Sequence, residues 1–172
     1  MIDTDYKITA LGILLDESCL SERYYPLIAL KDALIAGLST LGCQRKSEAE
    51  KLTDADFLKI GLADAGLVRL FRRFLTIYDP SPQKFREIPK VTSDPNEEKA
   101  FYELYALPGV KAVRASLYFA SGYRSLKDFA EANVGEILGK TAETIAAKGL
   151  SCITPLPKEI RTHIAVAKAF FM

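Results

Sequence analysis

The sequence predicts an all-α protein, from two helical patterns and the lack of a strand pattern. Apolar residues recur at helical spacing in two long stretches, each forming one stripe of a helix. The first stripe is Leu67, Leu70, Phe71, Phe74 and Leu75, and the second is Val134, Ile137, Leu138, Ala142 and Ile145. Strict apolar–polar alternation, the pattern of a half-buried strand, is hard to find. We therefore expect about ten short helices.

Cap residues mark where these helices begin. A Ser, Thr or Asn three residues before an acid can cap a helix, because its side chain satisfies a free amide of the first turn. The pattern predicts helix starts at Ser47 with Glu50, Thr53 with Asp56, Ser125 with Asp128, and Asn133 with Glu136. Asp94-Pro95 predicts a further start, and Pro157 begins a closing amphipathic helix over 157–171.

A proline-rich segment divides the chain. Residues 78–96 hold Pro80, Pro82, Pro89 and Pro95, four of the eight prolines. Proline lacks a backbone donor and disfavours helix at the residue before it. We therefore expect a linker over 78–96, between an N-terminal helical repeat (1–77) and a C-terminal one (97–172). Each half is small for a secure core alone, so the halves should pack together.

The two parts correspond at a spacing of 80 residues. The identical pairs are Tyr25/Tyr105, Leu27/Leu107, Lys31/Lys111, Gly42/Gly122 and Leu58/Leu138. The predicted caps at Thr53 and Asn133 follow the same spacing. This pattern favours a diverged internal duplication.

The charge balance excludes a strong polycation, since the net charge is +1. The chain has 23 Lys+Arg and 22 Asp+Glu. Residues 1–80 hold 10 Lys+Arg and 12 Asp+Glu, a net charge of −2. Residues 81–172 hold the remaining 13 Lys+Arg and 10 Asp+Glu, a net charge of +3. Any affinity for nucleic acid must come from a local patch, because affinity follows the number of phosphates neutralised.

Residues that could carry chemistry are sparse. Cys19, Cys43 and Cys152 are widely spaced and His163 is the only histidine, so we expect reduced thiols, no metal site and no cofactor. No acid–base or nucleophile set is evident, so we expect no catalytic residue and no enzyme. The opening stretch has acids at Asp3 and Asp5 and an interrupted apolar run, which predicts neither a signal peptide nor a membrane span. The reduced cysteines predict a cytoplasmic protein.

Residues 107–145, "LPGVKAVRASLYFASGYRSLKDFAEANVGEILGKTAETI", resemble the tandem helix-hairpin-helix domain family. In that family a Pro-Gly-apolar-Gly hairpin joins two helices, and a small residue follows where the helices cross. Pro108, Gly109 and Val110 fit the hairpin, and Ala115 fits the small residue. Residues 122–132 resemble the connecting helix, and 138–145 a shortened second hairpin in which Gly139 and Ala142 keep the close contact. The resemblance implies two diverged helix-hairpin-helix repeats packed together, with 24–61 as the degenerate copy.

The resemblance also implies a function. Hairpin glycines let backbone amides at a helix N-terminus approach a phosphate, which gives sequence-nonspecific binding of duplex nucleic acid. The residues placed at the phosphate are Gly109, Val110, Lys111, Arg114, Gly139 and Lys140. The alternative is a protein-interaction or assembly module, binding a protein partner or a second copy, that has kept the fold and lost nucleic-acid binding.

Lys111 is where the chain departs from the family, because it replaces the second hairpin glycine. Its side chain could block the close approach of a phosphate, or its ammonium could replace the lost amide contact. We expect it to be exposed in the first turn of a helix, near the Gly109 apex. Val110, Val113 and Leu117 fall at i, i+3 and i+7 and should face the core, which turns position 111 toward solvent.

Overall fold

The computed structural model describes residues 2–172 and is all-helical, as the sequence predicts. The first half contains η1 (Ile8–Ala10), α1 (Leu11–Glu17), η2 (Glu22–Tyr24), α2 (Tyr25–Ala29), α3 (Lys31–Thr40), α4 (Lys46–Glu50), α5 (Asp54–Lys59) and α6 (Ala65–Thr76). The second half contains α7 (Pro82–Arg86), α8 (Ile88–Val91), α9 (Pro95–Leu104), α10 (Ala112–Ala120), α11 (Leu126–Glu131), α12 (Val134–Lys148) and α13 (Pro157–Phe171). Extended pairing within the described residues is limited to one isolated bridge, between Lys7 and Arg45.

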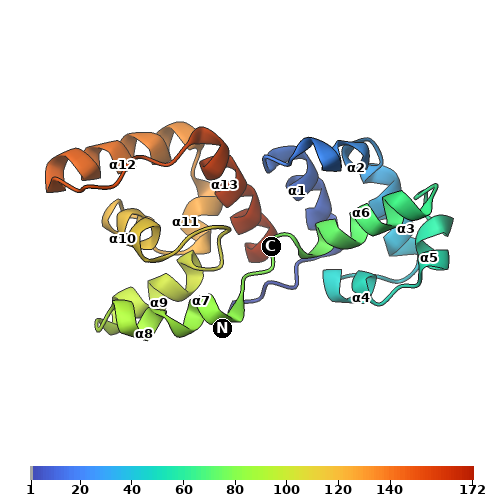
Figure 1. Ribbon diagram of the computed structural model, residues 1–172, viewed down its shortest axis with the longest axis horizontal. Helices are drawn as coiled ribbons and strands as arrows, with labels where there is room; N and C mark the ends of the chain where they lie inside the picture. The colour runs from blue at the N-terminus through green and yellow to red at the C-terminus, as the bar shows by residue number, and fades with distance from the viewer. Residues whose placement is uncertain (1) are drawn as a thin grey trace.

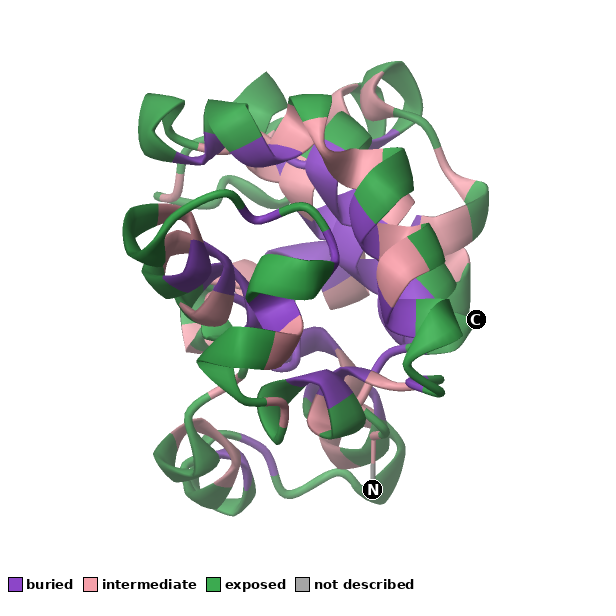
Figure 2. Ribbon diagram, turned by 90° about the vertical axis from the view of Figure 1, so that its right-hand side faces the viewer, coloured by how far each residue is buried: buried purple, intermediate pink, exposed green. Residues whose placement is uncertain are grey.

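Helix α13 joins the two halves, which lie side by side in Figure 1. It packs on α11 of its own half and on α1 of the other. Its buried residues fall on more than one side of the helix: Ile160, His163, Ile164, Ala165, Val166, Ala167, Ala169 and Phe170. Near the end of α13 the Phe170 ring stacks on that of Tyr6, with centroids 6.4 Å apart. The halves therefore share one core, and buried residues run through the interior in Figure 2.

The segment predicted as a linker is mostly folded. It forms α7 and α8 and contains the start of α9, and Pro82, Pro89 and Pro95 each stand in the first turn of one of these helices. Proline is tolerated there because the first-turn amides have no partner inside the helix. Ile88 is fully buried, which anchors the segment to the core.

Most of the predicted caps are confirmed. The side chains of Thr53, Asp94, Ser125 and Asn133 each accept a hydrogen bond from a first-turn amide, and Thr53 completes a capping box with Asp56. The prediction for Ser47 is wrong, because α4 begins at Lys46 and its N-cap residue is Arg45. The Ser47 amide and hydroxyl instead donate to the carboxylate of Asp5, at 2.8 and 2.6 Å.

Local geometry recurs at the spacing of 80 residues. Gly42 and Gly122 follow α3 and α10 and have φ of 84° and 97°. The next residue in each half donates to a carbonyl five positions back at 2.9 Å, Cys43 to Leu38 and Tyr123 to Tyr118. The halves then diverge, because α5 ends at Lys59 whereas α12 continues to Lys148.

Candidate phosphate-binding hairpin

The hairpin with the Pro-Gly sequence connects α9 to α10. Successive turns carry the chain around it, with the amide of Leu107 donating to Leu104 and that of Val110 to Leu107. Gly109, at the apex, has φ of +72°, a conformation that favours glycine. A Cβ built on Gly109 meets nothing within 4 Å, so the apex is open. Val110 is fully buried and fixes the turn to the core beneath.

The hairpin leaves the N-terminus of α10 accessible. Lys111 is the N-cap residue, in an extended conformation, and its side chain makes no capping hydrogen bond. The helical hydrogen bonds of α10 begin with the amide of Ala115, which donates to the carbonyl of Lys111 at 2.8 Å. The earlier first-turn amides carry the positive end of the helix dipole, which favours an anion.

Two lysines lie at this end of α10. Lys111 is exposed, as expected, although it precedes the first turn as the cap. The Lys84 ammonium donates to the carbonyl of Leu107 at 3.1 Å. Burial lowers the pKa of Lys84, and the charge of Lys111 lowers it further. The Lys84 ammonium is therefore bonded to the turn that leads into α10, and Lys111 caps the same helix.

An open hollow of about 640 Å³ lies beside the hairpin. Gly109, Lys111 and Arg114 line one part, the loop 151–153 another, and the carboxylates of Glu87 and Glu159 complete it. The hollow is therefore of mixed charge, and a ligand anion is attracted to the lysine side of it.

Arg114 is held by its own protein. Its Nε donates to Glu159 at 3.1 Å, and another guanidinium nitrogen donates to the carbonyl of Ile153 at 3.1 Å. The guanidinium also lies 6.0 Å from the ring centroid of Tyr118. Arg114 therefore ties α10 to the segment that leads into α13, and contributes little free charge to the hairpin.

Gly139 and Lys140 are not part of the same surface. The prediction of a second hairpin at 138–145 is wrong, because these residues lie inside the continuous helix α12. A Cβ on Gly139 meets nothing within 4 Å, so this glycine makes no close helix contact. Lys140 pairs with Glu136 at 3.4 Å and lies 5.4 Å from the ring centroid of Tyr123, which follows the far end of α10. The nine residues of α10 span about 13 Å and separate Lys140 from the hairpin.

Val113 also departs from expectation. Val110 and Leu117 are buried as predicted, but Val113 is 68% exposed. Helical spacing does not apply across the turn, because Val110 precedes the first helical residue, Ala112.

No functional role for His163 is evident from the sequence, yet this residue lies directly beneath the hairpin. Its Nδ1 is 2.9 Å from the Tyr118 hydroxyl and its Nε2 is 2.8 Å from the carbonyl of Pro108. A carbonyl can only accept, so Nε2 carries the proton and Nδ1 accepts from Tyr118. Burial lowers the pKa of His163 to about 4. The neutral imidazole therefore holds the hairpin to α13.

Residues 2–172 contain no group of three or more His, Cys, Asp or Glu side chains arranged to hold a metal ion. None of the helices in this range is long and apolar enough to cross a membrane. Cys43 is buried, Cys19 and Cys152 are half-buried, and all three are free thiols. A scan against protein-family models and searches of curated proteins and of solved structures find no match to this chain.

Proposed function

We propose that the protein binds duplex nucleic acid through its phosphate backbone, at the hairpin between α9 and α10. The observation that carries this proposal is the uncapped N-terminus of α10 beside the open Gly109 apex, with Lys111 exposed at the cap and the Lys84 ammonium bonded to the Leu107 carbonyl of the same turn. Free amides at a helix N-terminus and lysine charges both favour a phosphate. The lysine at the second-glycine position then supplies charge in place of one amide contact.

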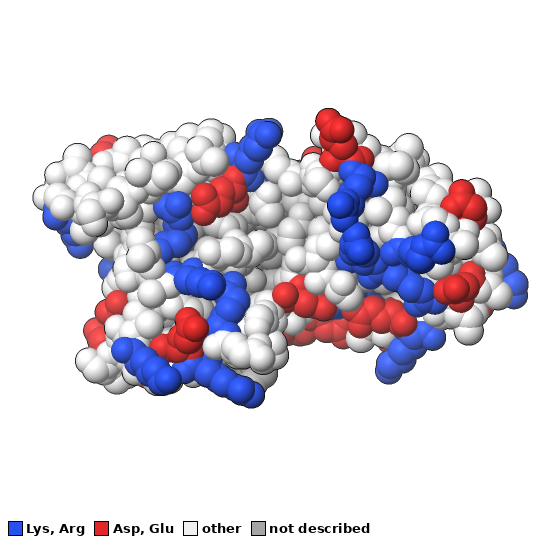
Figure 3. All heavy atoms as spheres, viewed as in Figure 1, with Lys and Arg blue, Asp and Glu red and all other residues white. Residues whose placement is uncertain are grey.

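The charge distribution supports a weak, salt-sensitive complex. On the face shown in Figure 3, basic side chains gather over α6 and over the region of α7 to α10, on either side of the hollowed middle, with an acidic strip below α6. A phosphate backbone crossing this face would meet basic side chains on both halves. With a net charge of +1, the whole chain adds little long-range attraction. Contacts to phosphates alone carry no base sequence information, so the binding is sequence-nonspecific.

Fluorescence anisotropy with labelled duplex DNA, measured over a series of salt concentrations, tests the proposal. Binding should be present at low salt and weaken steeply as salt rises. Lys111→Ala should weaken binding evenly across DNA sequences and lower the slope of log K against log salt by about one unit. Lys59→Ala, which removes an exposed lysine from α5 in the other half, is the matched control and should leave the slope unchanged.

The alternative, a protein-interaction or assembly module, is favoured by an apolar surface next to the hairpin. Val113, Ile153 and Leu156 are 68%, 75% and 65% exposed. A mostly apolar groove of about 420 Å³ runs between α10 and the segment that follows α12. If duplex DNA does not bind even at low salt, while sedimentation shows self-association that Val113→Asp abolishes, this second function is the better account.

We also infer that the chain arose by internal duplication of a helix-hairpin-helix-like unit. The recurring glycine turns, caps and backbone hydrogen bonds at the spacing of 80 residues support this inference. The first copy lacks the Pro-Gly apex, because α2 and α3 stand where the second copy has its hairpin. Superposition of 24–61 on 104–141 tests the duplication, and failure of the paired helices to coincide would contradict it.

A further inference from the structure

A separate hollow of about 490 Å³, with a lining of mixed polarity, lies in the first half, between the segment that precedes α1 and the turn that follows α3. Lys7 and Arg45 supply positive charge to its wall, Thr9 and Ser39 supply hydroxyls, and Gln44 supplies an amide. The buried residues Ile8 and Cys43 complete the lining. No Asp or Glu of residues 2–172 lines this hollow.

The backbone places Lys7 and Arg45 opposite each other, across the isolated antiparallel bridge. The flanking hydrogen bonds run from Ile8 to Gln44 and from Lys46 to Tyr6, each 2.9 Å long. Lys7 and Arg45 are therefore a non-hydrogen-bonded pair, in which opposite side chains lie on the same side and closest together. Like charges in this position destabilise a bridge unless an anion lies near both of them.

Two carboxylates lie near the hollow, and each already has a partner. Asp3 accepts from an Nη of Arg45 at 3.1 Å, and the same nitrogen donates to the carbonyl of Asp5 at 2.6 Å. The side chain of Glu48 accepts from the backbone amide of Gln44 at 2.6 Å. These contacts compensate Arg45 in part, but no carboxylate among residues 2–172 pairs with Lys7, which is exposed.

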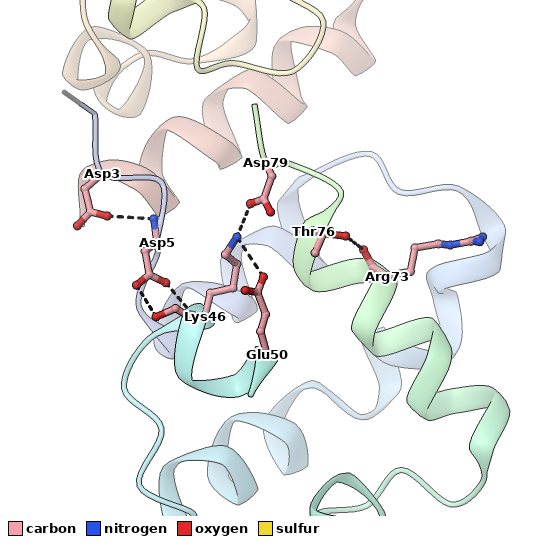
Figure 4. A network of polar contacts seen from close by, with 8 residues as sticks. Asp3, Asp5, Lys46, Glu50, Arg73, Thr76 and Asp79 are labelled. Atoms are coloured by element: carbon pink, nitrogen blue, oxygen red, sulfur yellow. Dashed lines mark hydrogen bonds and ion pairs between the residues drawn. The ribbon is translucent and has the colours of Figure 1, made fainter. Parts of the chain in front are cut away.

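The bridge is also held in place, so the site does not have to be ordered by a ligand. Figure 4 shows Asp5 bonded to the start of α4, and the Lys46 ammonium between Glu50 and Asp79. Lys46 is 6% exposed and lies 5.9 Å from the ring centroid of Tyr6. These contacts fix both sides of the Lys7–Arg45 pair, and preorganisation of this kind reduces the entropy lost on binding.

We propose that this hollow binds a small oxyanion, either free phosphate or the phosphate group of a small molecule. Lys7 and Arg45 attract the charge, and the hydroxyls of Thr9 and Ser39 donate to its oxygens. The Lys7–Arg45 pair carries the proposal, since an oxyanion between the two side chains relieves their repulsion. The site is distinct from the hairpin, and the proposal does not depend on nucleic-acid binding.

Backbone amide NMR spectra of the full chain, titrated with inorganic phosphate at constant ionic strength, test the proposal. We expect saturable shifts at residues 7–9 and 42–45. Lys7→Ala should weaken the affinity about tenfold, as expected for loss of one charge-assisted hydrogen bond. Lys51→Ala, an exposed lysine at the end of α4 that does not line the hollow, should bind as the wild type does.

A parallel titration with duplex DNA distinguishes the sources of phosphate. Shifts at 7–9 and 42–45 with inorganic phosphate but not with DNA assign a small anion to the hollow. Shifts at the same amides with DNA would instead make nucleic acid a source of the phosphate there. The proposal is overturned if the phosphate shifts do not saturate, if chloride produces the same shifts, or if Lys7→Ala binds phosphate as tightly as the wild type. None of these results concerns the amides of the hairpin, which report on the proposed function.

Discussion

Protonation of His163 should loosen the hairpin and destabilise the fold. The imidazole is 1% exposed, and its two nitrogens are bonded to Tyr118 and Pro108. Burial is the largest cause of its lowered pKa, and the charges of Arg114 and Lys84 lower it further. The Pro108 carbonyl and Glu159 act in the opposite direction without reversing the shift.

The sign and size of the effect follow from the difference between folded and unfolded states. The folded state has a pKa of about 4 for His163, against an ordinary value of 6.5. The unfolded chain therefore takes up the proton first as the pH falls. Full stability is present above pH about 6.5 and is lost as the pH falls toward about 4. At about 1.4 kcal/mol per pH unit, the loss is about 3 kcal/mol of unfolding free energy.

Urea unfolding of the wild type and of His163→Gln, followed by circular dichroism between pH 7 and pH 4, measures this loss. Gln stays neutral throughout this range. The unfolding free energy of the variant should therefore fall less than that of the wild type, and the difference between the two decreases should be about 3 kcal/mol. The carboxylates are common to both proteins and cancel in the comparison. Because the chain has one histidine, its imidazole proton resonance also reports the pKa directly. Equal pH dependence in the two proteins, or an imidazole that titrates near 6.5, would refute the reasoning.

The backbone makes further predictions that urea unfolding can check. Gly109→Ala should lower the unfolding free energy by about 1 kcal/mol, because an L residue is strained at φ of +72°. Gly139→Ala, at an exposed position inside α12, should instead raise it by about 0.5–1 kcal/mol. Gly37→Ala should lower it by about 1–3 kcal/mol, since the new Cβ would lie 2.4 Å from the Cβ of Ile60. Thr53→Ala removes a capping box and should lower it by about 1 kcal/mol.

Local rules predict much of this fold. The caps at Thr53, Ser125 and Asn133 depend on residues three positions apart, so the sequence contains all the information needed. The same rule fails at Ser47 because Asp5, more than 40 residues away along the chain, takes its hydroxyl and amide. A partner from a distant segment leaves no local signal.

The candidate site was predictable only in part. Pro108-Gly109 marks a turn by its own chemistry, and the left-handed conformation of Gly109 agrees with that. The partner of Arg114, Glu159, lies 45 residues away and becomes evident only in the fold. Glu136 lies four residues before Lys140, so their pairing follows from the continuous helix α12, where a second hairpin was expected. His163 lies 55 residues beyond Pro108, so nothing in the sequence indicates that it supports the hairpin.

The most direct test of the proposed function is a backbone amide NMR titration of the protein with duplex DNA at low salt. We expect shifts concentrated at residues 109–114 that diminish as salt is added and are reduced in Lys111→Ala. Absence of shifts at low salt, or shifts elsewhere with 109–114 unchanged, would contradict the proposal that this hairpin contacts the phosphate backbone.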